Sequence, residues 1–256
     1  MIRRQLITAV IVVVVMTVTL GFVYPLVVTA ISQVAFHSKA NGSLVKVNGK
    51  DVGSSLLGQN FTDKDGNPLP KYFQPRPSAA GADGYDASSS SASNLGPSNP
   101  NLIGNIPGVS ITDKTNIYAT PSDPYCVPVQ ATDKDDNPIT DKSGNPVYEK
   151  NKDGTYVCDP STVPQRAIAY RQLNGLASNA KVPVDAVTAS GSGLDPDISI
   201  ANADLQAQRV ATARNLPLAT VMAQIKKHTA GRNLGFLGEK AVNVLELNLG
   251  LDKLGS

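Results

Sequence analysis

The sequence contains no tryptophan, only two histidines and only two cysteines among its 256 residues. Two cysteines are too few for a disulfide scaffold or a four-cysteine zinc site, and no histidine lies between Cys126 and Cys158, so we expect no metal site. The formal net charge is only +2, and lysine and arginine are scattered along the chain. Proteins that bind nucleic acid usually concentrate basic side chains on one surface, so the composition argues against that class.

Enzyme motifs are also missing. The glycine-rich stretch SGSGLD does not end in the Gly-Lys-Ser/Thr of a P-loop, and no nucleophile-elbow pattern occurs. We therefore expect no catalytic residue. Two interpretations of the stretch stay open, a structural turn or a phosphate cradle that binds a cofactor. The cradle would consist of Ser190, Gly191, Ser192, Gly193 and Asp195.

A membrane anchor is predicted at the start of the chain. No Asp, Glu, Lys or Arg occurs between Arg4 and Lys39, and residues 6–24 are almost all Val, Ile, Leu, Ala, Met or Thr. A helix over this stretch is about 30 Å long at ~1.5 Å per residue, which matches the hydrocarbon core of a bilayer. Residues 1–36 are therefore predicted to form a cytoplasmic N-terminus and a transmembrane anchor.

The flanking residues predict the orientation of this anchor. Arg3 and Arg4 precede the apolar run, and short basic flanks stay in the cytoplasm, so the rest of the chain is expected outside. Tyr24 and Pro25 are then expected at the outer interface, where an aromatic ring and a helix break are tolerated. A cleaved signal peptide is the alternative, but its apolar region usually has only ~7–15 residues.

Residues 37–256 are predicted to form one α+β domain of mixed strands and at least two C-terminal helices. A short strand over 43–47 is closed by the hairpin turn Asn48-Gly49. Near the C-terminus, Ser199 is expected to cap a helix over 200–214, with Leu205, Val210 and Ala213 near one face.

Two further elements are predicted after that helix. Asn215 is expected to cap a second helix that has Pro217 in its first turn and stops at Gly231. In residues 245–251, leucine alternates with other residues, which favours a strand and leaves a helix as the alternative.

Residues 101–166 are predicted to be an insertion within the domain. Apolar periodicity is lost there, and turns such as DKDDNP and DKSGNP recur. We expect hairpin strands over 132–140 and 142–148, and a disulfide between Cys126 and Cys158 that closes the insertion. The spaced acids also suggest calcium, but an EF-hand loop needs glycine at its sixth position, where this chain has Pro138.

Arg76 lies between Pro75 and Pro77, which hold the backbone extended. One interpretation is that its guanidinium contacts an anion or a carboxylate. The other is that the side chain is exposed and packs its stem on Tyr72 or Phe73.

Several blocks together resemble the KdpC family, which belongs to the bacterial Kdp potassium-transporting ATPase, and they occur in that family's order over most of the chain. They are YPL, ANGSL, GSSLLGQNF, YFQPRPSA, SNLGPSNP, VPVDAVTASGSGLDPDIS, QRVATARNLP and VNVLELNLGLDKL, starting at residues 24, 40, 53, 72, 93, 182, 208 and 242. The chain departs from the family pattern by the insertion, and by SSASN at 90–94 where the family has a glycine pair.

The resemblance implies a non-catalytic, single-span subunit of a pump in the bacterial inner membrane. It would assemble a channel-like subunit, which carries potassium, with a P-type ATPase subunit, whose aspartate is phosphorylated. As a catalytic chaperone it would also raise the ATP affinity of the P-type subunit. No cofactor is expected to bind this chain tightly; ATP would act through the P-type subunit. Candidate contacts with partners are Tyr24, Pro25, Arg76 and Asn94, besides membrane lipid around the anchor.

Two other functions stay open. A membrane-anchored binding protein of the cell envelope would use the insertion to contact its ligand. An anchored hydrolase would use Ser190 or Ser192 with His228.

Overall fold

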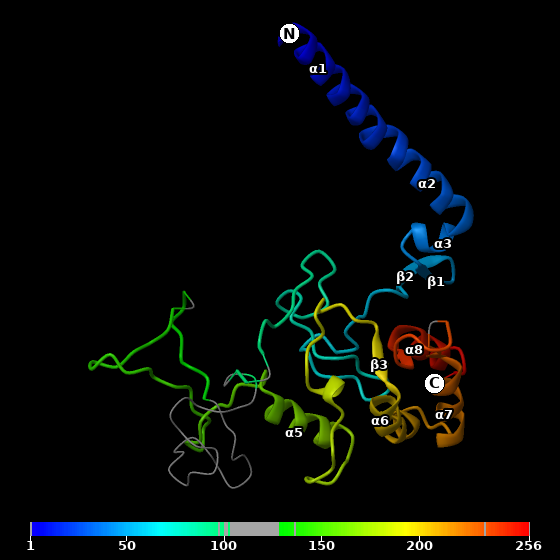
Figure 1. Cartoon of the computed structure of the whole chain (residues 1–256). Helices are drawn as coiled ribbons and strands as arrows, with labels where there is room; N and C mark the ends of the chain where they lie inside the picture. Colours follow the sequence, from blue (N-terminus) through cyan, green and yellow to red (C-terminus); the bar gives the residue numbers. More distant parts are fainter. Residues whose placement is uncertain are drawn as a thin grey trace. The chain divides into compact units, whose positions relative to one another are not determined.

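The computed structural model describes residues 2–96, 98–99, 102, 128–135, 137–232 and 234–255. The chain forms two compact units, Met1–Leu56 and Leu57–Ser256 (Figure 1). The prediction of one N-terminal apolar helix followed by a mixed α and β region is confirmed.

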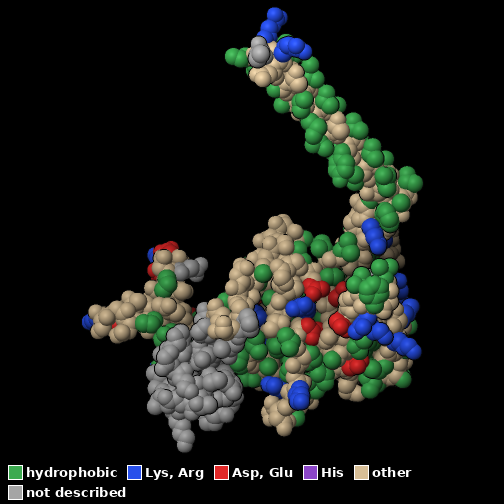
Figure 2. All heavy atoms as spheres, viewed as in Figure 1, with side chains coloured by type: hydrophobic (Ala, Val, Ile, Leu, Met, Phe, Trp, Pro, Cys, Tyr) green, Lys and Arg blue, Asp and Glu red, His purple; other side chains and the backbone are tan. Residues whose placement is uncertain are grey.

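The first unit begins with one long helix, formed by α1 (Ile2–Val18), a π-helical turn (Thr19–Val23) and α2 (Tyr24–Ala35). Its length and composition are sufficient to cross a membrane, and none of its described residues is buried by the rest of the protein. Figure 2 shows hydrophobic side chains along its surface and basic ones at its start. These features fit a single-pass membrane protein.

The helix does not break at Pro25. The amide of Tyr24 donates to the carbonyl oxygen of Thr19, five residues earlier, so the turn before the proline is wider than an α-helical turn. Because Pro25 has no amide hydrogen, this local widening lets the helix continue to Ala35. The helix is therefore longer than the segment that the sequence predicts to span the bilayer.

The rest of this unit contains α3 (His37–Ala40) and an antiparallel hairpin of β1 (Leu44–Val47) and β2 (Lys50–Ser54). Asn48 and Gly49 both have positive φ angles, 51° and 79°. Two consecutive positive φ angles match the right-handed twist of the flanking strands, which confirms the predicted hairpin turn.

The second unit has its regular elements mainly in the C-terminal part. They are α5 (Val163–Leu173), the 3₁₀ turn η2 (Val184–Ala186), β3 (Asp197–Ser199), α6 (Ile200–Ala213), α7 (Leu218–Lys227), β4 (Thr229–Ala230), β5 (Ala241–Asn243) and α8 (Val244–Asp252). The three strands form an antiparallel sheet in the order β3-β5-β4.

The core of this unit lies between the sheet and helices α6, α7 and α8. Helix α6 buries Ala203, Ala207 and Val210, which are spaced three or four residues apart and share one helix face. Its predicted N-cap is confirmed, because the side chain of Ser199 accepts a hydrogen bond from the amide of Asn202. The other buried members of the core are Phe73, Ile198, Ala211, Val221, Ile225, Val242, Val244, Leu247 and Leu251.

One predicted element is wrong, and the second predicted helix is present as α7 with a different cap and end. Residues 245–251 belong to helix α8 rather than to a strand, because Asn243 caps the helix by accepting from the amide of Glu246. Asn215 does not cap α7; it has a positive φ of 53° at the end of α6, and Pro217 precedes the first residue of α7. Helix α7 ends at Lys227, and β4 follows it.

The described part of the insertion, 128–135 and 137–158, is built from short arms around a cyclic set of backbone hydrogen bonds. The amide of Ala131 donates to Val147, that of Val147 to Ile139, and that of Ile139 back to Ala131, over 2.8–3.0 Å. Each arm folds back on itself, with bridges at Thr132–Pro138 and Thr140–Pro146. The hairpin strands predicted over 132–140 and 142–148 are not confirmed, since the described residues there form isolated bridges and turns instead of continuous strands.

The aspartates that begin these arms stabilise the turns. Asp133 Oδ1 accepts from the amides of Asp135 and Asn137, and Asp141 Oδ1 accepts in the same way from Ser143 and Asn145. These hydrogen bonds lower the pKa of both carboxyl groups. They also give the spaced acids a structural role, because each carboxylate closes a turn of the chain.

Candidate functional site

The extended segment 70–78 is the centre of the candidate site, and side chains rather than a strand bind its backbone. Asn248 of α8 accepts from the amide of Phe73 at 2.9 Å and donates to its carbonyl oxygen at 3.0 Å. Gln206 of α6 does the same for Gln74, at 2.7 and 3.0 Å. Each amide group therefore supplies the donor and acceptor that a neighbouring strand would supply.

Two arginines bind further carbonyl groups of this segment. Arg209 donates to Pro70 and Tyr72, and also to the side chains of Asn174 and Gln206. Burial lowers the pKa of Arg209 to about 10, because these acceptors are neutral oxygens that compensate only part of its lost hydration. The guanidinium holds the start of the segment against α6.

Arg214 holds the same segment against α8. It donates to the carbonyl oxygen of Lys71 at 2.6 Å and pairs with Asp252 at 2.8 Å. Its guanidinium also lies 4.9 Å from the ring centre of Tyr72. Arg214 is therefore a structural residue at the junction of α6, α8 and the extended segment.

Arg76 is the charged residue near the end of this segment. Its Nη1 is 3.0 Å from Asp195 Oδ2, and its Nη2 donates to the carbonyl oxygens of Thr188 and Ala189. The side chains of Arg76 and Asp195 keep 24% and 29% of their surface exposed. The predicted carboxylate contact is thus made inside the chain, and a contact of Arg76 with a partner stays a prediction.

The glycine-rich loop 190–195 is tightly connected to residues 78–91. The carbonyl oxygen of Ser192 accepts from the amide of Ser91 and the hydroxyl of Ser90, and that of Gly193 accepts from Ser78 Oγ. Within the loop, the amide of Leu194 donates to Ser192 Oγ. These groups hold the loop in place, and the phosphate cradle stays a prediction.

Burial and charge change the acidity of two groups beside the ion pair. Burial and the neighbouring Asp195 carboxylate raise the pKa of Tyr85, whose hydroxyl donates to the carbonyl oxygen of Arg76 at 2.9 Å. Burial and the same carboxylate raise the pKa of Asp197, whose amide donates to Asp195 Oδ1. The latter bond forms an Asx turn around Pro196.

A cavity of about 430 Å³ opens beside the extended segment. Its polar lining includes Arg76, Ser78 and Asp83, together with Arg166 from α5. Arg166 donates to the carbonyl oxygen of Val187, and burial lowers the pKa of its guanidinium.

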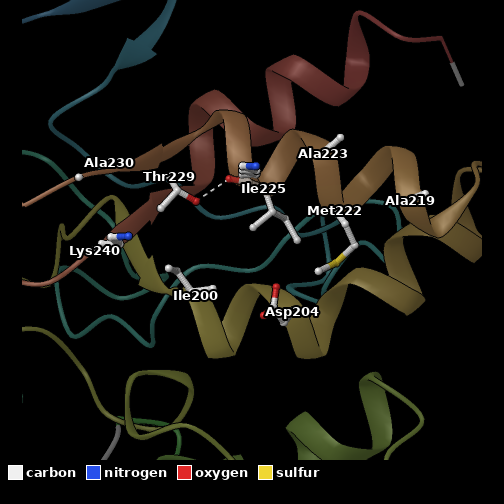
Figure 3. Close-up of a pocket in the computed structure, with 11 residues that line it drawn as sticks. Ile200, Asp204, Ala219, Met222, Ala223, Ile225, Thr229, Ala230 and Lys240 are labelled. Atoms are coloured by element: carbon white, nitrogen blue, oxygen red, sulfur yellow. Dashed lines mark hydrogen bonds between the residues drawn. The ribbon is translucent and has the colours of Figure 1, made fainter.

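A second cavity, of about 700 Å³, lies between α6 and α7. Figure 3 shows Met222 and Ile225 pointing from α7 toward Ile200 and Asp204 of α6. Its rim also contains Lys226, Gly231 and Lys240. Because these residues come from separate helices and from the chain around β4, no sequence motif marks this cavity.

The other predicted contact residues belong to two different units. Tyr24 and Pro25 belong to the first unit, where Tyr24 is 63% exposed. Asn94 is an exposed residue of the second unit with a positive φ of 54°. Contacts of these three residues with partners stay predictions.

The hydrolase alternative requires Ser190 or Ser192 together with His228, and these serines have different neighbours from the histidine. Ser190 is buried, and Ser192 Oγ accepts from Leu194. His228 lies at the end of α7, where its Nδ1 is 3.9 Å from Glu246 Oε2 and burial lowers its pKa. These contacts explain His228 as a structural residue that helps α7 to pack against α8.

The predicted disulfide involves one residue within the described structure. Cys158 is half-buried and its backbone pairs with Pro128, whereas Cys126 lies outside the described residues. Since Cys126 is two residues before Pro128 in the sequence, we expect a bond that closes the insertion and stabilises the fold by about 3 to 4 kcal/mol. Peptide mapping without reductant should recover the two cysteines in one linked peptide. Alkylation of both thiols in protein from an oxidising compartment would contradict the bond.

Comparison with known proteins gives a match over most of the chain. The family described as "K+-transporting ATPase, c chain" matches residues 6–130 and 158–253, which leaves out 131–157. The chain is 42% identical to the potassium-transporting ATPase KdpC subunit of Mycobacterium tuberculosis (strain ATCC 25618 / H37Rv) over 252 residues, 98% of this chain and 100% of that protein. It is 37% identical to the KdpC subunit of Koribacter versatilis, over 98% and 95% of the two chains. It is 39% identical to that of Methylococcus capsulatus, over 93% and 92%.

Proposed function

The chain belongs to the KdpC family of potassium-transporting ATPase subunits, and we propose that it assembles and stabilises a pump made of a channel-like and a P-type subunit. In this proposal the chain performs no chemistry. The polar side chains of its candidate site bind its own backbone, and the phosphorylated aspartate belongs to the P-type subunit. The alternative of an envelope-binding protein is not favoured, because relatives that match nearly the whole chain are named as pump subunits.

The N-terminal helix is the observation that carries this proposal. Its apolar residues are exposed within this chain, so they require lipid or another apolar surface. At ~1.5 Å per residue, the 34 residues extend about 51 Å, whereas about 30 Å is enough to cross the hydrocarbon core. We propose that α2, including Tyr24, packs along membrane helices of a partner subunit.

The basic start of the chain supports an orientation for this assembly. Arg3 and Arg4 precede the helix, and no acidic residue occurs before Asp51. By the positive-inside tendency, the N-terminus is cytoplasmic and the second unit lies outside the inner membrane. From that side, the second unit is suited to a place above the potassium entrance of the channel-like subunit.

The effect on ATP is proposed to be indirect. ATP is present in the cytoplasm, whereas the glycine-rich loop belongs to the unit that we place outside. The carbonyl oxygens of Ser192 and Gly193 also hold that loop to residues 78–91 of the same unit. We therefore propose that ATP binds the P-type subunit, and that this chain raises its affinity by stabilising the assembled complex.

A helix exchange tests this function. Residues 2–35 are replaced by an unrelated apolar helix of equal length that keeps the basic start, and the tagged chain is purified from membranes that contain both partners. We expect the native chain to recover the channel-like and P-type subunits in stoichiometric yield, and the exchanged chain to lose most of this recovery.

The matched control deletes 131–157, the residues outside the family match, and should keep full recovery. If the native chain is purified alone although both partners are present, the assembly function is wrong. If the exchanged chain recovers both partners as well as the native chain does, the contact of α2 is wrong and assembly depends on the second unit.

A further inference from the structure

The connection between β4 and β5 forms a protruding loop with a defined base. Ala230 of β4 pairs with Ala241 of β5, and beyond this pair Arg232 forms an ion pair with Glu239 at 3.1 Å. The tip of the loop, residues 234–237, follows this closed base.

The tip carries three large hydrophobic side chains that face solvent. Leu234 is 82% exposed, Phe236 is 70% exposed and Leu237 is 48% exposed. Leu234 also has a positive φ of 54°, a conformation that a bulky residue seldom adopts. Three neighbouring exposed hydrophobic residues at a loop tip indicate an interaction surface rather than scattered surface residues.

Basic side chains lie at the two ends of this loop. Lys226 and Lys240 line the cavity between α6 and α7, and so does Gly231, the first residue of the loop. Lys227 is exposed at the end of α7. Figure 2 shows hydrophobic side chains next to Lys and Arg side chains in the region where Figure 1 places α8. Of the acids nearby, Glu239 is paired with Arg232, and Asp204 faces the cavity from α6.

We propose that residues 234–237 insert into the interface of an anionic lipid bilayer, with Lys226, Lys227 and Lys240 contacting lipid headgroups. An anionic bilayer presents negative charge above an apolar layer, which matches an exposed apolar tip with basic side chains at the ends of its loop. The apolar N-terminal helix also ties the chain to a bilayer in the proposed function. This contact is separate from the anchor and from the proposed assembly with partner subunits.

The absence of tryptophan makes a direct test simple, since Phe236→Trp introduces a single reporter. The full-length variant is reconstituted without partner subunits into vesicles of anionic or neutral lipid, with and without lipids brominated close to the headgroup. In anionic vesicles we expect emission at shorter wavelength and quenching by bromine. Val184→Trp is the matched control, because Val184 is 73% exposed in the same unit, and its emission should stay that of a hydrated side chain.

Charge removal tests the lysines in the same assay. Lys226→Gln and Lys240→Gln should each lower the ratio of inserted to free loop by about fivefold in anionic vesicles, and much less in neutral ones. Leu237→Trp is the second reporter if Phe236→Trp does not fold. Equal emission from the tip and the control in every bilayer would overturn the proposal. The proposal would also be overturned if brominated lipid did not quench the fluorescence of the tryptophan at the tip while added partner subunits shielded this tryptophan from water. The loop would then bind protein.

Discussion

Replacing Gly193 by alanine should lower the free energy of unfolding by about 2 to 5 kcal/mol. Gly193 has a positive φ of 68°, where a side chain costs about 1 to 2 kcal/mol. An added Cβ would also lie 2.8 Å from Ala80 Cβ and would collide with the carbonyl oxygen of Ser91. Since one of these neighbours is backbone, relief requires moving the loop, and overpacking of this kind costs about 1 to 3 kcal/mol. Urea unfolding of the full chain in detergent, followed by circular dichroism, measures the loss.

Gly191→Ala is the matched control, two residues earlier in the same loop. Gly191 has no positive φ, and a Cβ there would meet nothing within 4 Å. Its substitution should change the free energy of unfolding by no more than about 0.5 kcal/mol. Equal stability of the two variants would show that the loop is not packed against residues 80 and 91. Loss of ATP-dependent transport in the Gly191→Ala variant alone would instead favour the phosphate cradle.

Elements that are specified by neighbouring residues could be predicted from the sequence. The Asn48-Gly49 turn and the Ser199 cap of α6 depend on side chains within a few residues, and both are confirmed. The N-terminal apolar helix is also confirmed, because the composition of that stretch is enough to predict it.

The error in α8 shows how one local pattern can hide another. Leu245, Leu247 and Leu251 alternate with other residues as in a strand, yet Val244, Asn248 and Leu251 are spaced for one helix face and are buried. The cap at Asn243 was the local signal for the helix. Ala213 was predicted near the same face of α6 as Val210. This prediction is wrong, because Val210 is buried and Ala213 is exposed.

The contacts of the candidate site could not be predicted, because they join residues far apart in the chain. Arg76 and Asp195 are 119 residues apart, and Asn248 and Phe73 are 175 residues apart. A single sequence shows that 72–77 is extended, since Pro75 and Pro77 restrict it. It does not show which side chains bind the extended backbone.

Asn248→Leu should lower the free energy of unfolding by about 2 to 6 kcal/mol. The two side chains have similar volumes, so the change leaves little cavity, but it removes both hydrogen bonds to Phe73. Asn248 and Phe73 are both 0% exposed, so water cannot replace the lost partner. Each unsatisfied backbone group then costs about 1 to 3 kcal/mol. The same urea unfolding measurement on the full chain detects this loss.

Gln208→Leu on α6 is the control for the change from amide to leucine. Gln208 is exposed and its hydrogen bond to Thr212 is on the surface, so we expect a change within about 0.5 kcal/mol. Gln206→Leu, which removes the equivalent bonds to Gln74, should resemble Asn248→Leu rather than this control. If Asn248→Leu is as stable as Gln208→Leu, the extended segment does not depend on side-chain amides. The position of Arg76 beside Asp195 would then have to be set by the remaining contacts of the segment, including those of Arg209 and Arg214.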